Sequence, residues 1–202
     1  MYFICIIGPV GSGKTTFTER LCSFLNFSAQ VISVEKRGDT CCVISVDNYF
    51  LPDQEDYDIP QALNVDLLKM HVQQLRNKQV VHNAPRYSFE KHSCTYDLTL
   101  NPCEYIFVEG HMNLCLFTKT DFDLVVYIDQ SDEQCYERRL IRDTQIREHR
   151  STFDVSLQHF QFTLPAQKKY VEPQKLQADV IVKNFEHFVL LCYLLCLYKN
   201  KN

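Results

Sequence analysis

The feature that most constrains this chain is the segment GPVGSGKT at residues 8–15, which fits the phosphate-binding loop pattern G-x-x-x-x-G-K-[ST]. An apolar run at 2–7 precedes it and predicts a strand buried on both faces, and residues 15–25 predict a helix. Glycines let backbone N–H groups surround phosphate oxygens, Lys14 can reach the outer phosphates, and the Thr15 hydroxyl can ligate Mg²⁺. The sequence therefore predicts a nucleotide-binding chain. The loop residues expected to bind the nucleotide are Gly8, Gly11, Ser12, Gly13, Lys14, Thr15 and Thr16.

Length and composition limit the class of protein. The 202 residues contain no Pro/Gly/Ser-rich linker, so we expect a single domain over 1–202. A net charge of -4 argues against nucleic acid as the main partner. The N-terminus has no charged leader and the ten cysteines include no C-x-x-C pair, so we expect a reducing, cytoplasmic setting without structural zinc.

Short apolar runs alternate with helical patterns along the chain. The runs are at 42–46, 105–108, 124–128 and 178–182, and helical patterns cover 64–75 and 131–142, the second opening with a Ser131/Gln134 capping box. Alternation of this kind predicts an α/β fold, here the P-loop NTPase fold, with a five-stranded, mainly parallel sheet flanked by helices. Residues 80–101 break the alternation and predict a small antiparallel excursion.

An almost wholly apolar stretch near the C-terminus predicts a helix over about 185–198. It is shorter than the roughly 20 residues that span a bilayer, which favours a helix packed on the sheet or at a subunit contact. A membrane tail remains the alternative.

Two acidic residues close predicted strands. Ligands of open parallel sheets bind beyond the carboxyl ends of the strands, so Asp47 and Glu109 are expected to face the phosphates. Asp47 would accept the proton of a substrate hydroxyl, and Glu109, with Thr15 and Asp47, would support a metal ion. The alternative for both acids is a cap of the following turn or helix.

Five arginines crowd into residues 138–150 and suggest a lid that closes over the nucleotide. The alternative is a solvated basic face paired with nearby acids. The arginines are Arg138, Arg139, Arg142, Arg147 and Arg150.

Several blocks in order resemble the uridine-cytidine kinase family of P-loop nucleoside kinases, over residues 4–182. They are SVDNYF (45–50), YDIPQAL (57–63), PRYSFEKHS (85–93), VEGH (108–111) and RRLIRD (138–143). The resemblance implies phosphorylation of uridine or cytidine at the 5′-hydroxyl, with ATP or GTP as donor, Mg²⁺, and a possible homo-oligomer.

The resemblance also implies roles for individual residues. Asp47 matches the catalytic base, which acts with Lys14 and Arg139, and Asp58 matches the acid that binds the ribose hydroxyls. The residues matching those that meet the base or wall the nucleoside are Tyr57, Tyr87, Phe89 and His92. Arg139 matches a lid and substrate arginine, and Arg142 and Arg147 match lid positions near the phosphates. Further positions expected at the substrate are Tyr49, Arg150 and His159.

The chain departs from the family pattern at Ile59, where the family usually has histidine, and at 146–150, where the lid has an extra residue. The altered lid keeps a catalytically weak nucleotide-binding scaffold as a non-enzymatic alternative. Nicotinamide riboside kinase is the enzymatic alternative, because it shares the loop and a strand that ends in an aspartate, as residues 44–47 do here. A GTP-dependent switch is disfavoured because residues 77–80, NKQV, lack the aspartate of the N-K-x-D motif.

Overall fold

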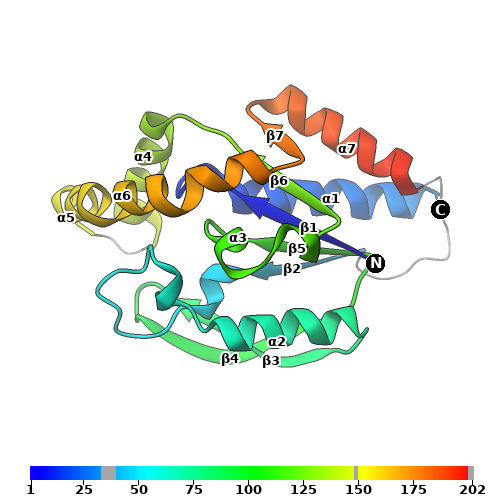
Figure 1. Cartoon of the computed structure of the whole chain (residues 1–202), viewed down its shortest axis with the longest axis horizontal. Helices are drawn as coiled ribbons and strands as arrows, with labels where there is room; N and C mark the ends of the chain where they lie inside the picture. The colour runs from blue at the N-terminus through cyan, green and yellow to red at the C-terminus, as the bar shows by residue number, and fades with distance from the viewer. Residues whose placement is uncertain (33–39, 148–149, 200–202) are drawn as a thin grey trace.

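A parallel sheet of five strands forms the centre of the computed structural model, which describes residues 1–32, 40–147 and 150–199 (Figure 1). The strands are β1 (Tyr2–Ile7), β2 (Cys41–Ser45), β5 (Tyr105–Glu109), β6 (Leu124–Ile128) and β7 (Val180–Val182). Their order is β2-β5-β1-β6-β7, and every neighbouring pair is parallel. The predicted five-stranded parallel sheet is confirmed.

Helices cover both faces of the sheet because β1 is apolar on both of its faces. Ile4 and Ile6 pack in a cluster with residues of α1 (Lys14–Ile32) and α7 (Phe185–Lys199). These two helices lie side by side (Figure 1), with the rings of Phe17 and Phe188 5.2 Å apart. Cys5 belongs to a separate cluster on the opposite face. On that side the larger cluster includes α2 (Val65–Arg76) and α3 (Asn113–Leu116).

The predicted antiparallel excursion is also confirmed. It is a two-stranded sheet of β3 (Val81–Ser88) and β4 (Ser93–Leu100), which packs on the same cluster as α2. Two short 3₁₀ helices, η1 (Val46–Tyr49) and η2 (Pro60–Ala62), connect β2 to α2. Phe50, just after η1, bridges to Leu63, just after η2, and so closes the loop that carries residues 51–62.

The short turn η3 (Lys119–Asp121) precedes β6, and a long, nearly continuous helical run follows β6. It starts with α4 (Asp132–Ile141), where the side chain of Ser131 accepts a hydrogen bond from the backbone N–H of Gln134, which is one of the two bonds of the predicted capping box. The later segments are η4 (Arg142–Arg147), α5 (Thr152–Gln158), η5 (His159–Thr163), α6 (Leu164–Ala166), η6 (Gln167–Val171) and η7 (Glu172–Gln177). The run crosses above the carboxyl ends of the strands (Figure 1).

The apolar C-terminal segment forms helix α7, as predicted, and it packs on α1 and the sheet. Across the part of the chain that the structure describes, no helix is long and apolar enough to cross a membrane. Each of the ten cysteines carries a free thiol.

Candidate active site

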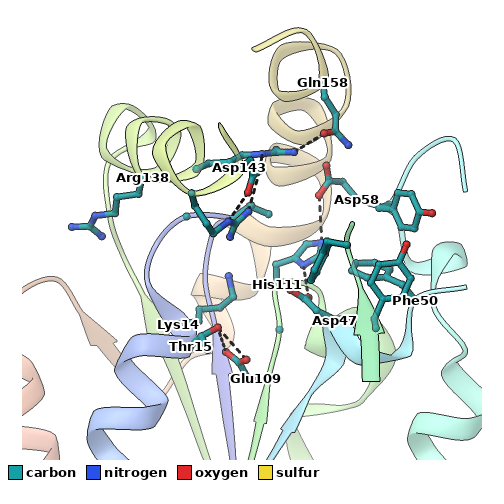
Figure 2. A pocket seen from close by; sticks show the side chains of 18 of the residues that line it. Lys14, Thr15, Asp47, Phe50, Asp58, Glu109, His111, Arg138, Asp143 and Gln158 are labelled. Carbon is teal, nitrogen blue, oxygen red and sulfur yellow. Dashed lines mark hydrogen bonds and ion pairs between the residues drawn. The ribbon is translucent and has the colours of Figure 1, made fainter. Parts of the chain in front are cut away.

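A cavity of about 700 Å³ opens at the carboxyl ends of β1, β2 and β5. The phosphate-binding loop, the residues after β2 and β5, the tip of the β3–β4 hairpin and the arginine-rich run of α4 and η4 all contribute to its lining (Figure 2). A pocket of this size accommodates a small ligand. Segments far apart in sequence therefore meet in one place, which is the edge where open parallel sheets bind ligands.

The loop after β1 has the conformation that phosphate binding requires. Gly11 and Gly13 have φ of 84° and 91°, a region that glycine adopts readily and other residues rarely do. The ammonium of Lys14 donates hydrogen bonds to the carbonyl oxygens of Gly8 (2.9 Å) and Pro9 (2.8 Å). These carbonyls hold the ammonium over the loop, where an incoming phosphate can replace them as partners.

The hydroxyl of Thr15 lies against the carboxylate of Glu109, with Oγ1–Oε distances of 3.1 and 3.2 Å. Burial and the charge of Asp47 raise the pKa of Glu109, against the effects of Lys14 and Thr15. Burial lowers the pKa of Lys14, although Asp47 and Glu109 oppose the shift. The carboxylates of Asp47 and Glu109 therefore repel each other, and burial also disfavours the charged form of Lys14, the cation beside them.

A divalent cation fits this arrangement. Mg²⁺ prefers oxygen ligands and keeps several waters, and it usually takes only one or two carboxylates from the protein and the rest from phosphates. Thr15, Glu109 and Asp47 offer such oxygens. Among residues 1–32, 40–147 and 150–199, no group of three or more His, Cys, Asp or Glu side chains could hold a metal ion by itself. The residues therefore suit a cation that binds together with a phosphate ligand.

Asp47 and Asp58 lie on either side of His111 (Figure 2). His111 Nδ1 is 3.9 Å from an oxygen of Asp47, and His111 Nε2 is 3.8 Å from an oxygen of Asp58. The Asp47 side chain is 37% exposed and lines the cavity, whereas Asp58 is buried. Asp47 lies in the first turn of η1, but the N-cap of that turn is Ser45. The carboxylate is thus available to a ligand.

Aromatic side chains form the wall of the cavity beyond Asp58. Phe50 contacts Tyr57, Tyr87 and Phe89 edge to face, with ring centroids 5.3, 5.6 and 6.3 Å apart. The ring of His92 lies 5.9 Å from that of Tyr57, and its Nδ1 is 3.4 Å from the Tyr87 hydroxyl. This aromatic wall, defined by these five residues, offers flat apolar faces together with the polar tips of Tyr57, Tyr87 and His92, which suits a heterocyclic ring.

The arginine-rich segment is tied together by Asp143. Arg139 is buried, and its Nε lies 3.3 Å from Asp143, while Arg142 Nε lies 2.6 Å from the same carboxylate. Burial would raise the pKa of Asp143, but hydrogen bonding and charge from Arg142 and Arg139 hold it below its ordinary value. At this position the segment is a buried ion cluster and not a solvated basic face.

The same cluster reaches the substrate side of the cavity. The Arg139 guanidinium donates to Thr163 and, at 3.0 Å, to Gln158. Thr163 in turn donates to Asp58 Oδ2 at 2.5 Å, and Arg150 Nη1 donates to Gln158 at 2.6 Å. Asp58 is therefore connected through one threonine to the arginines.

The structure brings most of the predicted site residues to the cavity. They are Gly11, Gly13, Lys14, Thr15, Thr16, Asp47, Tyr57, Asp58, Tyr87, Phe89, His92, Glu109, Arg139, Arg142 and Arg150. Gly8 and Ser12 belong to the same loop but do not line the cavity, and the side chain of Arg147 lies outside the described residues.

Two residues predicted at the substrate lie elsewhere. Tyr49 is buried beneath the loop, with its hydroxyl 2.9 Å from His71 Nδ1, because η1 turns this side chain toward α2. His159 is buried between Tyr136 and Phe160, at ring distances of 4.8 and 5.2 Å. Neither residue lines the cavity, so the structure does not bring them together with the other predicted site residues.

Some lining residues were not predicted as site residues from the sequence, among them Phe50, His111 and Gln158, and Arg138 was expected only as one of the lid arginines. His111 follows Glu109 by two positions at a strand end, which is a signal that could have identified it. Arg138 Nη1 lies 3.3 Å from the Ser12 carbonyl oxygen. Gln158 carries no motif, and only the fold of α5 brings it to the cavity.

A phosphate-binding loop, paired acids and a cluster of arginines around one cavity define a P-loop kinase. The similarity of the sequence to known protein families supports this class of protein. Residues 3–189 match the Phosphoribulokinase / Uridine kinase family. The chain therefore belongs to that family and is a phosphotransferase.

Individual relatives are similar over most of their length. A uridine kinase from Listeria welshimeri is 31% identical over 190 residues, which cover 88% of this chain and 84% of the relative. A uridine kinase from Oceanobacillus iheyensis is 30% identical over 192 residues, covering 89% of this chain and 84% of the relative.

Solved structures share the fold at low identity. A possible uridine kinase from Bacillus stearothermophilus has a TM-score of 0.63 at 20% identity, covering 90% of this chain and 88% of that one. A putative fructose transport system kinase from a Silicibacter species has a TM-score of 0.70 at 16% identity, covering 89% and 88%. These structures support the P-loop kinase fold.

Proposed function

We propose that this protein transfers the γ-phosphate of ATP to the 5′-hydroxyl of a pyrimidine ribonucleoside, uridine or cytidine. The observation that carries the proposal is the shared cavity, in which Lys14 and Asp47 face the same space as Asp58 and the aromatic wall. One end suits phosphates and the other suits a sugar with a flat base. The uridine kinases among the relatives support the choice of substrate.

Asp47 would act as the base. It accepts the proton of the 5′-hydroxyl as the hydroxyl oxygen bonds to the γ-phosphorus, and the bond to the β–γ bridging oxygen breaks to release ADP. Lys14 would hold the β- and γ-phosphates, exchanging its bonds to Gly8 and Pro9 for phosphate oxygens. Thr15, Glu109 and Asp47 would hold Mg²⁺, which when bound offsets phosphate charge.

The sugar and base would occupy the other end of the cavity. Asp58 would accept hydrogen bonds from the ribose hydroxyls, and its orientation is fixed by Thr163. Tyr57 and Phe89 would flank the base, while Tyr87 and His92 would meet its polar edge. His92 has φ of 47°, so its backbone at the hairpin turn is in the left-handed region, which few residues other than glycine adopt.

Arginines would stabilise the charge that develops on the transferring group. Arg139 and Arg142 line the cavity beside the loop, and we assign Arg142 and Arg147 to the phosphates and Arg139 to the substrate side. Arg150 would complete the substrate side through Gln158.

The test is a phosphate-transfer assay with purified protein, ATP and Mg²⁺ against uridine, cytidine, deoxycytidine and nicotinamide riboside. We expect uridine or cytidine to give the highest kcat/KM and the 5′-monophosphate as product. A preference for nicotinamide riboside would replace the proposed substrate. ATP binding without transfer to any nucleoside would identify a nucleotide-binding scaffold instead.

Asp58 gives a second test. Asp58→Ala should raise the KM for the ribonucleoside by about 10-fold or more, because a carboxylate acceptor for the sugar hydroxyls is lost, and leave the KM for ATP unchanged. Equal use of 2′,3′-dideoxynucleosides and ribonucleosides by the unaltered protein would contradict the role of Asp58.

A further inference from the structure

Among the described residues that line the cavity, His111 is a buried polar residue with a nitrogen that lacks a hydrogen-bond partner. Its side chain is 7% exposed and lines the cavity, yet Nε2 has no hydrogen-bond partner. A buried polar atom without a partner destabilises the fold, so native structures rarely leave one without a functional reason. A ligand that enters the cavity could supply the missing partner.

The backbone holds this ring where it is. Gly110, the preceding residue, lies so close to η1 that an added Cβ would come within 2.8 Å of Val46 Cβ and 2.3 Å of Asn113 Oδ1. Asn113 in turn donates to the Val108 carbonyl oxygen at 2.9 Å. The end of β5 is therefore packed tightly against η1, and His111 is held between the two aspartates.

The surroundings restrict what the partner can be. Asp47 lies 3.9 Å from Nδ1 and Asp58 lies 3.8 Å from Nε2, both too far for a direct hydrogen bond. A phosphate oxygen would add a third negative charge beside these carboxylates, which disfavours it. A hydroxyl is neutral and can both donate and accept, so it can serve the imidazole and the carboxylate together.

The distance fits a bridging hydroxyl. An oxygen about 2.8 Å from Nε2 and about 2.8 Å from Asp58 Oδ1 completes a triangle on the observed 3.8 Å side. Thr163 occupies the other oxygen of Asp58 and so fixes Oδ1 toward His111. An imidazole with a proton on Nε2 can donate to the bridging hydroxyl oxygen, and the hydroxyl can then donate to Asp58.

We propose that His111 is a substrate-binding residue whose Nε2 shares one ribose hydroxyl with Asp58, so that the pair selects nucleosides that carry this hydroxyl. The proposal rests on the proposed function, which supplies the ribose. It adds His111 to Asp58 as a second residue that recognises the ribose.

The test compares three variants with uridine, 2′-deoxyuridine and 3′-deoxyuridine, or with the cytidine series if cytidine is the better substrate. His111→Leu removes both nitrogens. His111→Gln places its amide near the position of Nε2, and His111→Asn places its amide near Nδ1. Thermal unfolding and ATP binding confirm that each variant is folded.

We expect His111→Leu to lower kcat/KM for the ribonucleoside by about 10-fold, mainly through KM, with an unchanged KM for ATP. For one of the two deoxynucleosides the same substitution should change kcat/KM by less than about 2-fold, because the hydroxyl that His111 binds is already missing. His111→Gln should keep more of the selectivity than His111→Asn.

Equal losses with uridine and with both deoxynucleosides would show a purely structural role and overturn the inference while leaving the proposed function intact. Full activity and selectivity in His111→Leu would overturn it as well. If the unaltered protein transfers phosphate to no nucleoside, the proposed function fails, and the inference fails with it.

Discussion

Replacing Gly11 with alanine tests the packing of the phosphate-binding loop against the arginine-bearing helix α4. A Cβ at Gly11 would lie 2.1 Å from the carbonyl oxygen of Cys135, a backbone atom that cannot rotate away. The same change at Gly13 is a matched control, since its Cβ would meet only Arg138 Nη1, at 3.8 Å. Both glycines have φ in the left-handed region, 84° and 91°.

The two variants share one cost and differ in another. Alanine in a left-handed conformation costs about 1–2 kcal/mol at either position. Overpacking adds about 1–3 kcal/mol at Gly11 only. A protein of this size loses about 2–4 °C of Tm for each kcal/mol, so Gly11→Ala should unfold about 2–12 °C below Gly13→Ala.

The assay is thermal unfolding followed by circular dichroism, with unaltered protein beside both variants. Gly13→Ala should unfold somewhat below the unaltered protein and Gly11→Ala clearly below both. Equal Tm values for the two variants would refute the reasoning, because they would show that the loop does not pack on α4 as closely as the structure indicates.

Two further predictions concern the ion cluster and the aromatic wall. The lowered pKa of Asp143 means that its ionised form stabilises the fold above the unfolded-state pKa of about 3.9, and that this stabilisation is lost as pH falls through the lower folded-state pKa. Asp143→Asn should therefore lower Tm at pH 7 but by much less at pH 3, and an equal gap at both pH values would contradict the assignment. Phe50 is 5% exposed, whereas Phe89 is only partly buried. Phe50→Ala should therefore lower the free energy of unfolding in urea by about 3–5 kcal/mol, and Phe89→Ala by clearly less. A larger loss of stability in Phe89→Ala would contradict this ranking.

The sheet could be predicted from the sequence because its strands are short, apolar and β-branched. Strands β1 and β6 begin and end at the predicted residues, and β5 differs by one residue. The last strand is shorter than predicted, since Ala178 and Asp179 precede Val180 without joining the sheet, although the Asp179 amide donates to the Val125 carbonyl oxygen. The local sequence pattern predicts the apolar run, but not the residue at which hydrogen bonding to the neighbouring strand begins.

The places of the phosphate-binding loop and of the acids at the strand ends were also predictable. The loop motif has a known physical role in phosphate binding, and parallel sheets bind ligands beyond the carboxyl ends of their strands. The positions of Tyr49 and His159 outside the cavity lining could not be predicted. In a helical turn, a difference of one residue changes which side of the turn a side chain faces. Thr163, which joins Asp58 to Arg139, has no motif, and only the packing of η5 against the loop after η1 reveals it.

Asp47→Asn offers the most direct test of the account, because it keeps the size of the side chain and removes its basicity. We predict that kcat for phosphate transfer falls by about 10²-fold or more, while ATP binding measured by calorimetry is retained, since Lys14 keeps its place at the phosphates and Thr15 and Glu109 remain to hold Mg²⁺. Glu55→Gln, at an exposed acid of the same cavity, is the control and should stay near the unaltered rate. Turnover by Asp47→Asn within a few-fold of the unaltered protein would contradict the claim that this carboxylate is the base.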